Sequence, residues 1–102
     1  MTVKLRTMTA ADVEALTAIE QTCFSDAWSE RMVRDLADSI WDEVWVLEAE
    51  DILGYINYRF IAGEGELMRI AVLPEYRGRG YSKALMDAMM EAAAKNQITD
   101  LT

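Results

Sequence analysis

One segment of the chain, residues 69–85, constrains the fold and the chemistry more than any other. It reads RIAVLPEYRGRGYSKAL: an apolar run, a proline, a loop of alternating arginine and glycine, and an amphipathic stretch. The apolar run predicts a buried strand, Pro74 marks its end, and the stretch after Gly80 predicts a helix. N–H groups at a helix start that follows glycines can hold a phosphate or a pyrophosphate, so this segment predicts an anion site.

The charge of this segment differs from that of the rest of the chain. The formal net charge is −8, yet four of the ten Lys and Arg residues fall within residues 69–83, where Glu75 is the only acid. The acidic balance argues against nonspecific nucleic-acid binding and favours a cationic partner such as a protein amine. The alternative interpretation is an ordinary strand–turn–helix joint with solvated arginines. The four basic residues are Arg69, Arg77, Arg79 and Lys83.

Composition narrows the class of protein further. With 102 residues, 52% of them hydrophobic, and no repeat or linker, we expect a single domain over residues 1–102. Cys23 is the only cysteine and histidine is absent, which excludes an internal disulfide, a histidine triad and a histidine metal site. We expect no metal. The sequence shows neither a signal-like apolar run nor a membrane-spanning stretch, so we expect a cytoplasmic protein.

The hydrophobic pattern predicts the element order βααβββαβ, an α/β (α+β) fold with a mixed, mostly antiparallel sheet and helices on both faces. We expect strands at residues 3–6, 43–49, 52–61, 66–73 and 98–102. Two helices should follow Thr9 and Ser29, and a third should cover residues 81–95. The last strand–helix–strand unit is a crossover, which makes its two strands parallel.

Several residues have expected local roles. Gly54 suggests a bulge, residues 62–65 a hairpin turn, and Asn96 a left-handed helix end. Cys23 should be buried. The methionines are expected to fill the core, and the tryptophans to lie in the core or in a groove; these are Met32, Met68, Met86, Met89, Met90, Trp28, Trp41 and Trp45.

The arginine and glycine loop fits one of three nucleotide-site patterns. It lacks the Gly-Lys-Ser/Thr end of a P-loop, and it lacks the third glycine and the downstream acid of a dinucleotide fingerprint. Arg77-x-x-Gly80-x-Ser82 resembles the acetyl-CoA motif of the GNAT superfamily of N-acetyltransferases, with Ser82 in place of the usual Gly or Ala. Phe24-x-x-x-Trp28-Ser29-Glu30, Ile70-Ala71-Val72 and Tyr76 look like the bacterial ribosomal-protein-alanine N-acetyltransferase branch.

This resemblance implies acetyl-CoA as cosubstrate and an acetyl-CoA motif at residues 66–95. It implies that the strand backbone pairs with the pantetheine amides and that the loop N–H groups receive the pyrophosphate. It also implies transfer of the acetyl group by direct attack of an amine, favoured as a protein N-terminal amine, with the 24–28 loop shaping the acceptor groove. The implied cofactor-binding residues are Ile70, Ala71, Val72, Arg77, Gly78, Arg79, Gly80, Tyr81 and Ser82.

The resemblance assigns no catalytic residue within this chain. The family's base and its acid tyrosine are expected beyond Thr102, and Tyr55, Tyr76 and Tyr81 are candidates by residue type only. We therefore expect a truncated N-acetyltransferase, inactive or impaired. Uncovered edges should favour a homodimer or a swapped assembly. The alternative is a noncatalytic CoA- or anion-binding module, or an assembly-forming fragment.

Overall fold

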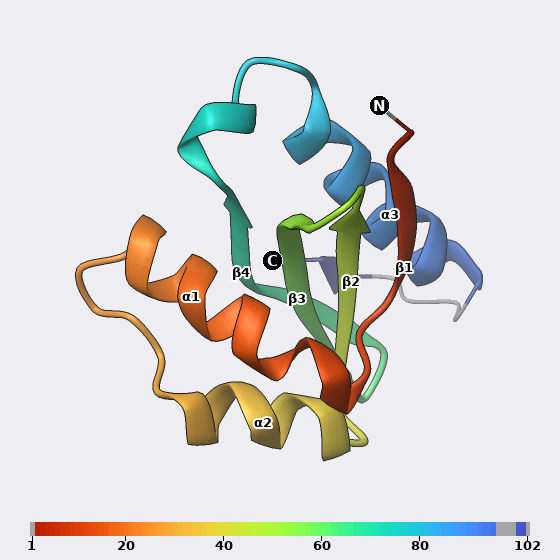
Figure 1. Cartoon of the computed structure of the whole chain (residues 1–102). Helices are drawn as coiled ribbons and strands as arrows, with labels where there is room; N and C mark the ends of the chain where they lie inside the picture. The colour runs from red at the N-terminus through yellow and green to blue at the C-terminus, as the bar shows by residue number, and fades with distance from the viewer. Residues whose placement is uncertain (1, 96–99, 102) are drawn as a thin grey trace.

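The computed structural model describes residues 2–95 and 100–101 as one five-stranded sheet with helices on both faces (Figure 1). The strands lie in the order β1-β2-β3-β4-β5; β1 to β4 are antiparallel, and β5 is parallel to β4. The predicted order βααβββαβ and the parallel crossover are confirmed. The elements are β1 Lys4–Thr7, the 3-10 turn η1 Ala10–Asp12, α1 Val13–Cys23, α2 Glu30–Asp38, β2 Asp42–Glu48, β3 Ile52–Ile61, β4 Glu64–Val72, the 3-10 turn η2 Pro74–Tyr76, α3 Tyr81–Lys95 and β5 Asp100–Leu101.

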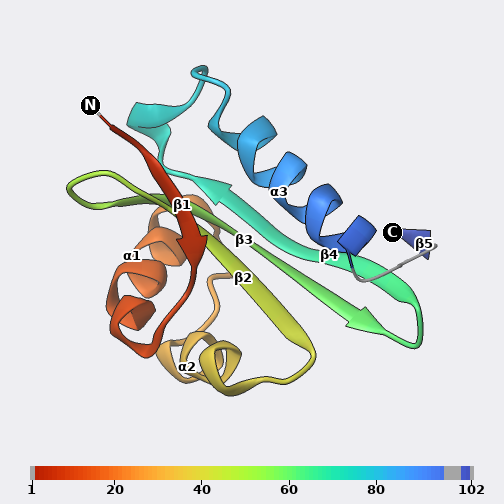
Figure 2. The ribbon, with the colours of Figure 1, turned by 90° about the vertical axis from the view of Figure 1, so that its right-hand side faces the viewer.

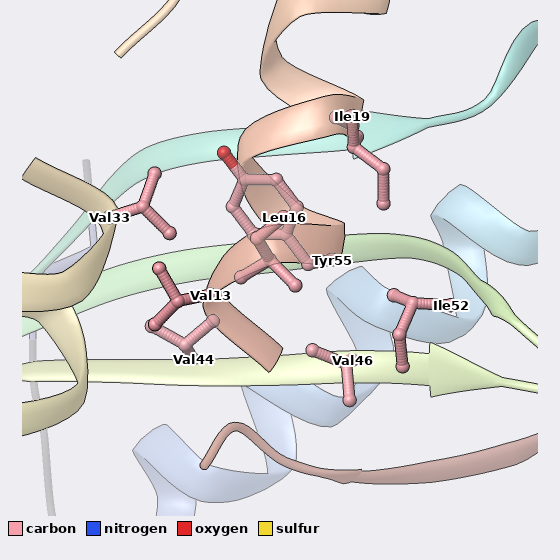
Figure 3. Close-up of a cluster of buried hydrophobic side chains, with 9 residues drawn as sticks. Val13, Leu16, Ile19, Val33, Val44, Val46, Ile52 and Tyr55 are labelled. Carbon is pink, nitrogen blue, oxygen red and sulfur yellow. The ribbon is translucent and has the colours of Figure 1, made fainter. Parts of the chain in front are cut away.

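Two apolar layers hold the helices to the sheet. Figure 2 shows α1 and α2 on one face and α3 on the other. On the first face, Tyr55 of β3 packs among aliphatic side chains of α1, α2 and β2 (Figure 3). On the second face, Leu85 and Met89 of α3 pack on Ile56 and Tyr58 of β3. The side chains of Leu85 and Ile56 are fully buried, and burial of a side chain of this size stabilises the fold by roughly 1.5–3 kcal/mol.

The helix starts follow from local sequence. The Thr9 N–H donates to the Asp12 carboxylate at 2.8 Å, and the chain then winds through η1 into α1. Ser29 accepts a hydrogen bond from the Met32 N–H at 3.2 Å and caps α2. Asn96 lies outside the described residues, as do the ends of the strand predicted at 98–102.

The strands depart from the predicted pattern at three points. The hairpin turn is shorter than expected: within residues 62–65 only Ala62 and Gly63 have positive φ values, 54° and 82°, and β4 begins at Glu64. Gly54 pairs with Leu47 while Ile52 pairs with Glu48, so the bulge is at Leu53, one residue from the predicted position. A second irregularity, at Met68 of β4, was not expected from the sequence.

Three side chains expected in the core or a groove lie at the surface. Met32 and Met90 are 50% and 51% exposed. Met32 precedes the buried stripe of its helix by one position and Met90 follows that of its own helix by one position, so both side chains point away from the sheet. Trp41 is 52% exposed in the segment between α2 and β2. Cys23 is only partly buried.

Candidate functional site

The arginine and glycine loop lies between the end of β4 and the start of α3. Gly78 and Gly80 have φ values of 80° and 81°, which a side chain would strain. A Cβ at either position would meet nothing within 4 Å, so the loop surface in front of both glycines is open. These two glycines therefore serve the backbone turn and leave room for a ligand.

The start of α3 leaves N–H groups without an acceptor inside the helix. The first backbone bond of the helix runs from the Ala84 N–H to the Gly80 carbonyl at 3.1 Å. The N–H groups of Tyr81, Ser82 and Lys83 precede that bond, so the helix itself offers them no acceptor. Together with the positive end of the helix dipole, they form the kind of site that holds a phosphate group.

A cavity of about 370 Å³, here called the loop cavity, joins this helix start to the edge of β4. Within the described residues, the register of β4 with β5 covers only Glu64 and Gly65, so the outer edge of β4 from Glu66 to Val72 has no strand partner there. The cavity therefore places backbone groups of an open strand edge beside helix N–H groups. Its walls are Cys23, Phe24, Ile70, Ala71, Val72, Tyr76, Arg77, Gly78, Gly80, Tyr81 and Ser82.

Eight of the nine residues predicted to bind cofactor line this one cavity, and Arg79 does not. The guanidinium of Arg79 lies over the Tyr76 ring, 5.6 Å from its centroid. The walls also contain Cys23 and Phe24 from the end of α1, which we did not predict there. No sequence signal placed them at this cavity, because only the tertiary packing of α1 against β4 brings them to it.

Arg77 braces the loop to the strand. Its Nε donates to the Val72 carbonyl at 2.8 Å, and its Nη2 lies 3.6 Å from the Cys23 sulfur. A hydrogen bond from a cation is stronger than one between neutral groups, so this contact fixes the loop against the end of β4. The side chain thus has a structural partner in addition to the anion-binding role that we predicted for it.

The remaining two cations of the basic cluster are paired with carboxylates. Lys83 contacts Asp87 at 3.0 Å on the surface of α3. Arg69 is paired with Glu20 of α1, through Nη2 to Oε1 at 2.8 Å and Nε to Oε2 at 3.1 Å. The positive charge available at the loop is therefore that of Arg77 and Arg79.

Glu20 is fully buried, and both of its carboxylate oxygens accept two hydrogen bonds. Besides Arg69, it accepts from the Trp28 N–H at 2.8 Å and from the Tyr55 hydroxyl. Burial alone would raise the pKa of Glu20, but these hydrogen bonds outweigh it and hold the pKa below the ordinary 4.5. Burial, and then the bond to Glu20, raises the pKa of Tyr55, so this phenol is unsuited to give a proton to a substrate.

The Glu20–Arg69 pair could have been suspected from the sequence. Glu20 falls on the apolar stripe of α1 with Leu16 and Ile19, and Arg69 interrupts an apolar strand. A charge at a buried position needs a partner of opposite sign. The pattern does not say which partner, since 49 residues separate the two.

The described residues hold no group of three His, Cys, Asp or Glu side chains that could bind a metal. Searched over the same residues, none of the helices has the length and apolar character needed to cross a bilayer. The fold and the loop together define an α/β domain in which an open strand edge lies beside a helix start of the kind that can hold an anion.

Comparison with known proteins places the domain. The chain belongs to the Acetyltransferase (GNAT) family, whose model matches residues 13–102. It is 28% identical over 81 residues to the [ribosomal protein bS18]-alanine N-acetyltransferase of Haemophilus influenzae, and 25% identical over 89 residues to a protein of Bacillus subtilis with the same name, there qualified as unproven. The matches cover 79% and 85% of this chain, but only 56% and 59% of those relatives.

Solved structures share the fold. The ribosomal-protein-S18-alanine N-acetyltransferase of Escherichia coli superposes with a TM-score of 0.90 at 21% identity, over 98% of this chain and 64% of that one. The PaiA N-acetyltransferase of Thermoplasma acidophilum, solved in complex with coenzyme A, gives 0.82 at 18% identity, over 96% and 76%. The predicted fold class and the predicted family are therefore confirmed.

Proposed function

We propose that this chain binds acetyl-CoA in the loop cavity and provides the donor site for acetyl transfer to a protein N-terminal amine. The observation that carries the proposal is the joining of an open β4 edge and the α3 N–H groups in one cavity of about 370 Å³. An amide-bearing pantetheine chain would add to the strand edge, and the pyrophosphate would lie against Gly78, Gly80 and Ser82.

The reaction is transfer of an acetyl group from sulfur to nitrogen. The amine, after losing a proton, attacks the thioester carbon; the new C–N bond forms, the C–S bond breaks, and the thiolate takes up a proton. Backbone N–H groups at Ile70 to Val72 would stabilise the developing oxyanion. We assign no base and no acid to residues of this chain.

The acceptor is proposed to be a basic protein segment with a free N-terminal amine, as found in the bacterial cytoplasm. Two observations support this class: the relatives above are named for a ribosomal protein alanine, and this chain has a net charge of −8. An acidic protein attracts a cationic acceptor over distances up to about the Debye length.

Isothermal titration with coenzyme A and acetyl-CoA tests donor binding, and acetyl transfer to a set of basic peptides tests activity. Gly80→Glu places a carboxylate at the proposed pyrophosphate position and should abolish measurable binding. Gly63→Glu is the matched control, since Gly63 has φ 82° against 81° for Gly80 and equally open surroundings, but lies in the β3–β4 turn. Equal affinities in the two variants would refute the proposed donor site.

The transfer assay also separates the two hypotheses raised by the sequence. Donor binding together with transfer supports the acetyltransferase. Donor binding without transfer to any peptide supports a noncatalytic coenzyme A module. The expected homodimer is a separate proposal, and sedimentation at working concentration tests it; a strictly monomeric species would contradict it.

A further inference from the structure

A second cavity lies on the α2 side of the sheet. It has a volume of about 440 Å³, is called here the helix cavity, and is lined by Trp28, Met32, Leu36 and Met68, with Asp35 and Asp42 among its polar groups. Phe24 lines the loop cavity and Trp28 lines the helix cavity. The short segment from Phe24 to Trp28 therefore runs from one cavity to the other, and it is called here the wall.

Arg69 holds this wall from the sheet side. Its guanidinium lies 3.7 Å from the centroid of the Phe24 ring and 4.6 Å from that of the Trp28 ring. Its Nη2 also donates to the Asp26 carbonyl at 3.2 Å. A guanidinium over aromatic faces is attracted to both rings, so one side chain contacts the start, the middle and the end of the segment.

Glu20 holds the wall from the helix side. Its Oε1 accepts from the Trp28 N–H at 2.8 Å, while the carboxylate also receives the Arg69 fork and the Tyr55 hydroxyl. The pair is thus tied to α1, β3, β4 and the wall at once. A carboxylate and a guanidinium that are each held by several hydrogen bonds have little freedom to move, so a loop bound to them is held in one position.

Stability alone does not account for the pair. Apolar residues of similar volume often stabilise a core as well as a buried ion pair does, because removing two charges from water is costly. What this ion pair does, and an apolar pair would not, is fix the position of Phe24 and Trp28. Because Phe24 lines the loop cavity, the position of this wall sets the shape of one side of that cavity.

We propose that Glu20 and Arg69 are positioning residues of the donor site, which fix the Phe24–Trp28 wall and thereby the side of the loop cavity that Phe24 forms. This inference rests on the proposed function. It concerns loop geometry that can be read without any ligand.

The test is fluorine NMR of the chain labelled with 5-fluorotryptophan. It gives one signal each for Trp28, Trp41 and Trp45, assigned by single Trp→Phe substitutions. Glu20→Gln removes the charge that holds Arg69 and should shift or broaden the Trp28 signal while the other two signals stay. The double variant Glu20→Gln with Arg69→Met removes both charges, so it leaves no unpaired buried ion and guards against simple unfolding.

Asp12→Asn is the matched control. Asp12 is also a buried carboxylate paired with an arginine, at 2.8 Å from both Nη atoms of Arg6, and it lines neither cavity. The Trp28 signal of this variant should stay where the parent has it. A Trp28 signal unchanged in both Glu20 variants, or moved as far by Asp12→Asn, would overturn the positioning role.

Coenzyme A titration adds a functional readout. Because Phe24 lines the loop cavity, the double variant should bind coenzyme A about tenfold more weakly, a loss of about 1.4 kcal/mol, and Asp12→Asn should bind like the parent. Unchanged affinity in the double variant would count against the role. A parent chain that does not bind coenzyme A overturns the proposed function itself, and that failure is distinct because the Trp28 signal is read without ligand.

Discussion

Gly54→Ala should destabilise the sheet at the strand that carries the site. A Cβ built on Gly54 would lie 2.5 Å from the Ala71 carbonyl oxygen and 3.1 Å from the Val72 Cα. Both atoms belong to the backbone of β4, so no side-chain rotation relieves the contact. Forcing extra atoms into a packed interior costs about 1–3 kcal/mol, and the upper part of this range is expected here.

The assay is urea unfolding followed by circular dichroism, with thermal unfolding as a second measure. For a domain of this size, each kcal/mol lowers Tm by about 4–8 °C. Ala71 and Val72 also line the loop cavity, so the displaced strand should weaken coenzyme A binding as well.

Gly63→Ala is the control for Gly54→Ala. It meets nothing within 4 Å but has φ 82°, so only backbone strain of about 1–2 kcal/mol opposes it. Coenzyme A affinity should not change in this variant. The reasoning is refuted if Gly54→Ala unfolds at the same urea concentration as the parent, or if both variants lose the same affinity.

Two further predictions follow from hydrogen bonds that arginines donate. Hydrogen bonds from arginines hold the pKa of Asp12, Glu20 and Asp42 below the ordinary values of 3.8 for Asp and 4.5 for Glu, despite burial. The stability that these groups contribute is present above those values and is lost as the pH falls through the folded pKa. The free energy of unfolding should therefore drop below about pH 4.5, and the drop should be smaller in Glu20→Gln. An identical dependence on pH in the parent and in Glu20→Gln would contradict this. Arg77→Lys keeps the charge but loses the Nε bond to Val72, so coenzyme A should bind several-fold more weakly by calorimetry; unchanged affinity would show that the brace is dispensable.

Local sequence was enough to predict the loop and the helix after it. Two closely spaced glycines, a proline after an apolar run and the amphipathic stretch that follows are short-range signals, so residues 77–82 and α3 could be predicted without knowledge of the rest of the fold. The cavity that these residues line also needs Cys23 and Phe24, whose place depends on how α1 packs on β4.

The features that we did not predict from the sequence depend on contacts between segments that are far apart in the chain. The Met68 bulge and the close approach at Gly54 arise from pairing between strands, which local propensity does not encode. The exposure of Met32 and Met90 depends on which of two adjacent apolar positions faces the sheet. The Glu20–Arg69 pair joins elements 49 residues apart, so the sequence indicates two charges in apolar surroundings but not their contact.

The central claim is that backbone N–H groups from Gly78 to Lys83 hold the diphosphate of coenzyme A. The most direct measurement is a coenzyme A titration of the 15N-labelled chain, followed amide by amide. The largest shifts should fall on Gly78, Gly80 and Ser82 and on the β4 edge at Ala71, while Gly63 stays fixed. Saturable shifts centred on another part of the chain, with these amides unmoved, would contradict the account.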